Sequence, residues 1–299
     1  MTRRFFCALI FNVFAVAAWA SGGVAPGGSA SGKAPENHFA TAGSKERFRS
    51  IFEKGRDIGY FYYEELTHKL LPMFRGVPYG SGGGGCPGDK TFVNFQSFDC
   101  VTFVETWWAM SYTLYEYHSG KLKKDDDTFQ AFVRNLDRIR YFGGENCGIE
   151  FRIHYFTQAL EELDRSGLAF NVAYANGFPF KKTINYISNN GDIYGGLATN
   201  PQHKSFEAVL NKTPRFFYPS QHREMYYPMA KDGDIIAFAS TEPGLDVSHC
   251  GIVTVEDDEP KVNHASQLYG KVVLGQDLEM YMRSRAGKVN GFFVYRPKH

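Results

Sequence analysis

The sequence predicts a single α+β domain, and the order of its patterns is the main reason. Before Asp234 apolar residues recur at helical spacing, whereas after it short β-branched and aromatic runs alternate with polar turns. Helices followed by a meandering sheet usually pack as helices against an antiparallel sheet. The 43% hydrophobic content of the 299 residues is enough for a sizeable core, and no internal repeat is visible.

The first two helices are placed by their start and stop signals. One is expected from Ser44 to Leu71, with Ser44 as its N-cap and with Gly55 and Gly59 breaking or bending it. The next is expected from Cys100 to about Tyr117, because VTFVETWWAMSYTLYEY contains neither Pro nor Gly and a Ser-Gly pair follows it.

The remaining elements follow the same rules. Further helices are expected from the Asp125–Asp127 cluster to about Tyr141, at His154–Asp164, around Phe206–Leu210 and near Asp277–Arg285. Strands are expected at IIAFA (235–239), GIVTV (251–255), KVVL (271–274) and FFVY (292–295).

Cys100 is the first candidate for chemistry, because it stands where a helix is predicted to begin. The unpaired N–H groups and the positive end of the helix dipole favour a thiolate there, and the thiolate is the reactive form of cysteine. Asp99, just before it, could bind a polar group of a substrate or simply cap the helix. A plain buried cysteine is the alternative interpretation of Cys100.

Two histidines on neighbouring strands strengthen the catalytic interpretation. DVSHCGIVTV places His249 at the start of one strand, and KVNHASQ places His264 on the next, with the polar turn EDDEP between them. A hairpin would set the two side by side, with His249 facing the thiolate and His264 behind it. A cysteine hydrolase needs this set of nucleophile, base and orienting group. Cys250 is expected to face away from His249.

The same three residues could also form a zinc site, so a metal has to be weighed. Cys100, His249 and His264 make a Cys/His₂ set, but the sequence contains no H-x-x-x-H or C-x-x-C ligand pair. We therefore expect no metal and no other cofactor.

The N-terminus resembles a secretory signal. Two arginines, a short apolar run and the cleavage-like Ala18-Trp19-Ala20 predict a signal peptide over residues 1–20, removed near Ala20. An anchoring helix is the alternative, although the run is too short to span a bilayer. Residues 21–43 are expected to be a flexible linker and residues 44–299 a single domain. Because the signal peptide would be removed, we expect a periplasmic or secreted protein with no stable membrane insertion. In such a compartment Cys86 and Cys147 could pair, although spacing alone does not establish connectivity.

The net charge of the chain bears on whether it binds nucleic acid. The formal net charge is only +1 because basic and acidic residues nearly balance. Nucleic-acid-binding domains normally carry a basic face or a high pI, so we expect no nucleic-acid partner.

Four segments together resemble a known superfamily. GVPYGSGG (76–83), FDCVTFVE (98–105), SHCGIV (248–253) and NHAS (263–266), in this order, are similar to the NlpC/P60 superfamily of cell-wall cysteine peptidases and amidases. Further segments, among them RIRYFGG (138–144), KDGDIIAF (231–238) and GFFVYRP (291–297), resemble more narrowly its N-acetylmuramoyl-L-alanine amidase-like family. The resemblance covers nearly the whole chain from Gly76 onward.

The resemblance implies a papain-like fold, in which the nucleophile helix packs on the sheet that carries the histidine. Residues 141–229 would be an insertion that lines the cleft. The catalytic set would be Cys100, His249 and His264. Further contacts to the oxyanion or the substrate are expected from Tyr79, Asp99, Ser248, Arg152 and His154. Tyr79 could instead be a loop aromatic, and Arg152 a plain surface residue.

The implied activity is hydrolysis of the bond between N-acetylmuramic acid and L-alanine in peptidoglycan fragments, with anhydro-muropeptides as the expected substrates. Two alternatives stay open at this point. One is an NlpC/P60 endopeptidase that cuts at the D-glutamyl bond within the stem peptide. The other is a periplasmic muropeptide-binding protein without activity, for which the 18 tyrosines and 27 phenylalanines offer loose support.

Overall fold

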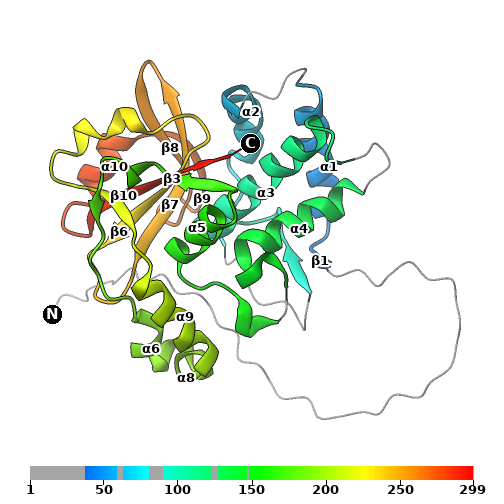
Figure 1. Ribbon diagram of the computed structural model, residues 1–299. Helices are drawn as coiled ribbons and strands as arrows, with labels where there is room; N and C mark the ends of the chain where they lie inside the picture. The colour runs from blue at the N-terminus through cyan, green and yellow to red at the C-terminus, as the bar shows by residue number, and fades with distance from the viewer. Residues whose placement is uncertain (1–37, 59–62, 81–89, 123–126, 147, 299) are drawn as a thin grey trace, which may run out of the picture.

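The computed structural model describes residues 38–58, 63–80, 90–122, 127–146 and 148–298. In this part of the chain, helices from the N-terminal half lie beside an antiparallel sheet built largely from the C-terminal half (Figure 1). The predicted α+β class is therefore confirmed. The expected signal peptide and the pairing of Cys86 with Cys147 lie outside the described residues.

Regular structure is present within the segment that was expected to be a linker. β1 (His38–Ala40) lies inside the predicted linker and pairs in parallel with β2 (Thr91–Val93). Aromatic contacts hold this segment in place. The Phe39 ring stacks on Phe92 with centroids 5.9 Å apart, and the His38 ring meets Phe129 edge-on at 5.0 Å.

The first predicted helix is divided in the structure. α1 (Ser44–Arg56) and α2 (Tyr63–Leu70) are separate helices, and η1 (Leu71–Phe74) is a 3₁₀ turn after them. Gly55 lets α1 approach α3, because a Cβ at this position would lie 2.5 Å from Leu114 Cδ1. Ser44 is not the N-cap as expected. Gly43 occupies that position, and Ser44 Oγ instead accepts the Phe95 N–H at 2.9 Å.

α3 (Cys100–His118) is the central helix of the molecule. Its apolar residues surround the whole helix, which is typical of a buried helix, and both Trp107 and Trp108 are fully buried. α4 (Thr128–Arg140) packs against it, and Asp127 caps α4 by accepting the N–H groups of Phe129 and Gln130. Both helices begin and end within a few residues of the predicted positions.

The main sheet has eight strands in the order β4-β5-β10-β6-β7-β8-β9, with β3 paired to β10, and every pairing is antiparallel. The strands are β3 (Ala169–Asn171), β4 (Phe178–Pro179), β5 (Phe216–Pro219), β6 (Ile235–Ser240), β7 (Val247–Glu256), β8 (Glu259–Ser266), β9 (Lys271–Asp277) and β10 (Val289–Pro297). One face packs on α3 and its neighbours, and the other packs on α10 (Leu278–Ser284).

The segment 141–229, expected as an insertion, is joined to this sheet through β3 and β5, which both pair with β10. Its α-helices are α5 (Phe156–Arg165), α6 (Tyr186–Asn189), α7 (Gly191–Tyr194), α8 (Gly196–Thr199) and α9 (Pro201–Lys212). Its 3₁₀ turns are η2 (Phe142–Gly144), η3 (Ile149–Phe151), η4 (Val172–Tyr174), η5 (Arg223–Met225) and η6 (Tyr227–Met229).

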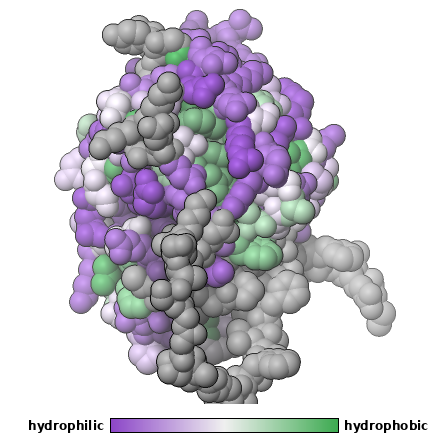
Figure 2. Space-filling model, turned by 90° about the vertical axis from the view of Figure 1, so that its right-hand side faces the viewer, coloured by the Kyte–Doolittle hydropathy of each residue, from purple (hydrophilic) through white to green (hydrophobic). Residues whose placement is uncertain are grey.

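The surface on the side of the N-terminal helices is mostly hydrophilic, with a strip of apolar residues across its middle (Figure 2). Among the described helices, none combines the length and the apolar character that a membrane crossing requires.

Candidate active site

Cys100 is the first residue of α3, and its neighbours hold this end of the helix firmly. Asp99 is the N-cap, and its Oδ1 accepts the Thr102 N–H at 2.7 Å. The Thr102 hydroxyl in turn accepts the Asp99 N–H at 3.0 Å, which completes a capping box. Cys100 is 2% exposed. Asp99 therefore performs the capping role that the sequence analysis left open, and Cys100 stands at the positive end of the helix dipole.

The two histidines lie on the predicted hairpin. Asp257 and Asp258 form the turn between β7 and β8 with positive φ angles of 52° and 62°, as a tight hairpin turn requires. The register, with Ile252 opposite Asn263, brings His264 alongside Gly251. A Cβ on Gly251 would lie 3.2 Å from the Cβ of His264, so the glycine leaves room for the two imidazoles on this face.

A relay of three side chains runs across this face of the sheet. His249 Nε2 is 2.7 Å from His264 Nδ1, and His264 Nε2 is 2.7 Å from Gln276 Oε1. The amide oxygen of Gln276 only accepts, so His264 Nε2 carries the proton and neutral His264 accepts at Nδ1. His249 Nε2 must then donate, which leaves Nδ1 of neutral His249 unprotonated. The relay therefore prepares His249 as a base.

Gln276 was not predicted from the sequence, because a bulge determines which residue it faces. β9 contains one extra residue between the pairs Val262–Gln276 and His264–Val273, and Gly275 there has a φ of +75°. The bulge puts Gln276 opposite Val262, on the face that carries His264. Gly275 and Gln276, just after the predicted strand 271–274, are a sequence signal for a bulge. This signal does not reveal how β9 pairs with β8.

Both histidines are held neutral. Burial, with smaller contributions from the charges of His264 and Arg285, places the pKa of His249 well below 6.5. Burial lowers the pKa of His264 to about 4, although the hydrogen bond to Gln276 opposes this shift. Tyr281 of α10 packs against both imidazoles, with ring centroids 5.8 Å from His249 and 5.6 Å from His264. The sequence analysis did not anticipate this tyrosine.

The start of α3 meets β7 through Cys250. Its Sγ donates to the carbonyl oxygen of Cys100 at 3.2 Å. Because side chains alternate along a strand, Cys250 points to the opposite face from His249, as expected. Burial raises the pKa of Tyr281, Arg285 opposes the rise, and an electrostatic interaction with Cys100 adds to it. Cys100 is thus within electrostatic reach of the aromatic group around His249.

Tyr79 lies in a loop that is paired with the segment just before Cys100. Its backbone N–H donates to the Gly270 carbonyl at 2.8 Å, and it forms a bridge with Phe98, two residues before Cys100. Ser248 has a single long contact at 3.5 Å from its hydroxyl to the Phe238 carbonyl. Both side chains are half-buried.

Arg152 is paired inside the protein. Its Nη2 donates to Glu105 Oε1 at 3.1 Å, while Arg140 Nε donates to Glu105 Oε2 at 2.6 Å. Glu105 is 3% exposed, so these residues form a buried ion triad one turn beyond Cys100. The positive charge of Arg152 also reaches Asp99, where it opposes the pKa rise caused by burial.

His154 lies nearby and leaves one nitrogen unused. Its Nε2 is buried and has no hydrogen-bond partner among the described residues. Burial, followed by the charges of Arg152 and His203, lowers its pKa to about 3. A neutral imidazole with a spare nitrogen can still contact a ligand.

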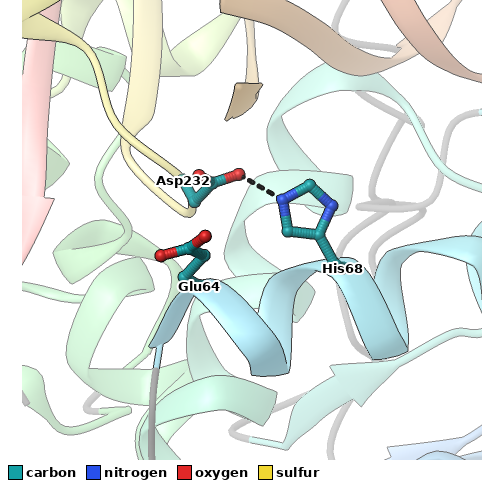
Figure 3. A group of neighbouring side chains, drawn as sticks. All are labelled: Glu64, His68 and Asp232. Atoms are coloured by element: carbon teal, nitrogen blue, oxygen red, sulfur yellow. Dashed lines mark ion pairs between the residues drawn. The ribbon is translucent and has the colours of Figure 1, made fainter. Parts of the chain in front are cut away.

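Glu64, His68 and Asp232 form the one group of metal-type ligands found in the described residues (Figure 3). Glu64 and His68 project from α2 toward Asp232, and the His68 Nε2–Asp232 Oδ1 distance is 2.7 Å. Asp232 also accepts the Val255 N–H at 3.0 Å. These contacts tie α2 to the turn before β6. An exposed pair of this kind contributes roughly 0–1 kcal/mol.

Two open clefts lie away from the relay, with volumes of about 480 and 510 Å³. Both include Pro179, Phe180, Lys181 and Lys182, and neither is lined by Cys100, His249 or His264.

Solved structures with a similar fold include three that align over most of this chain. An N-acetylmuramoyl-L-alanine amidase from Bacteroides uniformis is 26% identical, with a TM-score of 0.67 over 85% of this chain and 100% of that one. A protein from Bacteroides fragilis, named provisionally as a xylanase, is 30% identical, with a TM-score of 0.64 over 76% of this chain and 98% of that one. A Legionella pneumophila protein at 17% identity, with a TM-score of 0.60 over 85% of this chain and 95% of that one, shares the fold alone.

No curated protein sequence matches the chain. A family model does, over residues 69–288, and its description is N-acetylmuramoyl-L-alanine amidase-like. This match spans more than half of the chain and contains the capped cysteine, the hairpin and the relay. The chain belongs to the N-acetylmuramoyl-L-alanine amidase-like family.

Proposed function

We propose that the protein is a cysteine amidase with the papain-like NlpC/P60 arrangement. Its reaction would be hydrolysis of the bond between N-acetylmuramic acid and L-alanine in peptidoglycan fragments. The observation that carries the proposal is the relay from Gln276 through His264 to His249, which ends on an unprotonated nitrogen. The family supports an amidase that acts on cell-wall material.

In this mechanism Cys100 attacks the muramoyl carbonyl carbon and His249 accepts the thiol proton. A C–S bond forms, the C–N bond to L-alanine breaks, and His249 returns the proton to the leaving amine. Water then hydrolyses the thioester, with His249 again acting as the base. His264 and Gln276 keep His249 in the required tautomer throughout.

The negative charge that develops on the carbonyl oxygen needs donors. The first N–H groups of α3 have no acceptor within the helix, so the N–H of Cys100 is one natural donor. Tyr79 is proposed as the second, since its loop is bonded to the segment just before Cys100. Ser248 and Asp99 are proposed only as secondary contacts to polar groups of the substrate.

Small soluble fragments are the proposed substrates, above all those that end in 1,6-anhydro-muramic acid. The spare nitrogen of His154 offers a hydrogen bond to a sugar or peptide group. Arg152 would contribute its charge, because its nitrogens already serve Glu105 and the Arg140 carbonyl. The proposed signal peptide would take the enzyme to the periplasm, where such fragments are released.

Two other activities are less well supported by the site. Glycosidases work with a pair of carboxylates about the scissile bond, whereas the described site offers a thiol and two imidazoles. A D-glutamyl endopeptidase would use the same catalytic set, so only the products separate it from the amidase.

Incubation with a defined anhydro-disaccharide tetrapeptide, followed by mass spectrometry, tests the proposal. The expected products are free tetrapeptide and intact anhydro-disaccharide. A sugar-linked dipeptide would assign the protein to the endopeptidases instead. Tight binding without turnover would make it a muropeptide-binding protein.

A further inference from the structure

Cys250 is a second thiol beside Cys100 that the proposed mechanism does not use. Its Sγ lies 3.2 Å from the carbonyl oxygen of Cys100, and both cysteines are free. Cys250 is 0% exposed and Cys100 2% exposed, so both belong to the packed contact between β7 and α3.

This contact places the sulfur of Cys250 close to the Cys100 side chain. A carbonyl oxygen lies roughly 2.4 Å from its own Cα, so Cys250 Sγ is within about 6 Å of the Cα of Cys100. Disulfides join cysteines whose Cα atoms are roughly 4.4–6.8 Å apart, and a sulfur this near to the partner's Cα is compatible with that separation. Burial and then a hydrogen bond to the Cys100 side chain raise the pKa of Cys250, which indicates that the two thiols are neighbours.

We propose that Cys250 is a resolving cysteine, which closes a reversible disulfide with Cys100 when a peroxide oxidises Cys100. The Cys100 thiolate attacks one peroxide oxygen, an S–O bond forms, the O–O bond breaks, and the hydroxide that leaves takes up a proton. The sulfur of Cys250 then attacks the sulfenic sulfur. The S–S bond forms, the S–O bond breaks, and the departing hydroxide takes the thiol proton as water.

The bond would switch hydrolysis off and protect the nucleophile. A sulfenic acid without a neighbouring thiol proceeds to the sulfinic and sulfonic forms, which a thiol reductant does not reverse. A disulfide is returned to two thiols by a dithiol. His249, His264 and Gln276 take no part in the bond, so disulfide formation leaves the relay in place. The loss of activity rests on the proposed function, whereas formation of the bond does not.

The test compares the full chain with Cys250→Ala and Cys250→Ser after treatment with hydrogen peroxide. In the wild type, peptide mapping without reductant should recover the Cys100 and Cys250 peptides joined, and dithiothreitol should restore activity. Mapping is needed because the chain also contains Cys86 and Cys147, which could form other disulfides. In both variants activity should be lost irreversibly, and Cys100 should appear as the sulfinic acid. Two variants are used because they place different groups in the core.

Absence of the Cys100–Cys250 peptide pair in oxidised wild type would overturn the proposal. So would equal recovery of activity by the wild type and both variants. If the peptide pair forms in a protein that does not hydrolyse muropeptides, the resolving cysteine stands and the proposed function fails.

Discussion

The site contains two buried polar groups, the ion triad and the histidine relay, and they differ in one respect. The ion triad of Glu105, Arg140 and Arg152 is closed, since both oxygens of the carboxylate are taken by guanidinium groups. The relay that ends on His249 is open, since its last imidazole keeps one unprotonated nitrogen. A closed group chiefly holds elements together, whereas an open one can exchange a proton.

The two groups are also carried by different kinds of element. The triad joins α3, the end of α4 and the segment after it, all within the helical part of the molecule. The relay spans β7, β8 and β9, where neighbouring strands hold side chains at fixed separations. Rigid strands suit a proton relay because its distances must be kept within a few tenths of an ångström.

Removal of the nucleophile or the base should have the largest effect on activity. Cys100→Ala and His249→Ala should each lower kcat by about 10⁴-fold or more, because the catalytic pair acts as a unit. Rates are measured on the anhydro-disaccharide tetrapeptide, and circular dichroism checks the fold. Iodoacetamide should inactivate the wild type and EDTA should not. Loss of activity to a chelator, restored by zinc, would refute the cysteine mechanism.

Breaking the ion triad should lower the free energy of unfolding and leave catalysis largely intact. Glu105→Gln leaves two buried guanidinium groups without their carboxylate, which typically costs 3–5 kcal/mol. Urea unfolding measures the loss, and kcat of the folded fraction should stay near the wild-type value. An inactive variant of unchanged stability would show that the triad takes part in the reaction.

The orienting members of the relay should have an intermediate effect. Gln276→Ala removes the acceptor that fixes the His264 tautomer, and a loss of about 10–100-fold in kcat is typical of such supporting residues. Gln276→Glu is the matched control, because it keeps an acceptor at the same place and should retain more activity. His264→Asn should also retain measurable activity, since its oxygen can still accept from His249. Equal inactivity of His264→Asn and His249→Ala would contradict these roles.

The comparison also shows which features could be predicted from the sequence. The capped cysteine and the hairpin depend on residues close together in the chain, so local patterns were sufficient. Gln276 depends on a bulge in β9, and Tyr281 on how α10 packs against the sheet. Neither a register shift nor the packing of a helix is encoded in a short stretch of sequence.

Arg152 is a further residue whose surroundings could not be predicted from the nearby sequence. Its sequence context suggested a guanidinium available for a carboxylate, and only the fold brings Glu105 to it from 47 residues away. The strand β1 within the predicted linker was not foreseen for a similar reason, because Phe39 packs against Phe92 on a strand that is distant in sequence. Contacts between distant segments override local tendencies at both places.

The smallest expected effect is a dependence of stability on pH that comes from the relay. The pKa of His264 is about 4 in the folded protein and 6.5 ordinarily, so between these values the unfolded chain binds a proton that the folded chain does not. Stability from this group is therefore complete above pH 6.5 and decreases as the pH falls toward 4. For one such group the loss between pH 7 and pH 5 is about 2 kcal/mol.

Urea unfolding of the wild type and His264→Asn at both pH values measures this contribution by difference. The surroundings of His264 that matter are Gln276, Tyr281, His249 and the charge of Arg285. His249 has a lowered pKa of the same sign, so the variant should keep part of the dependence and lose the share that belongs to His264. If the two proteins lose the same stability between pH 7 and pH 5, His264 is not held neutral by burial, and the open group titrates like a solvent-exposed histidine.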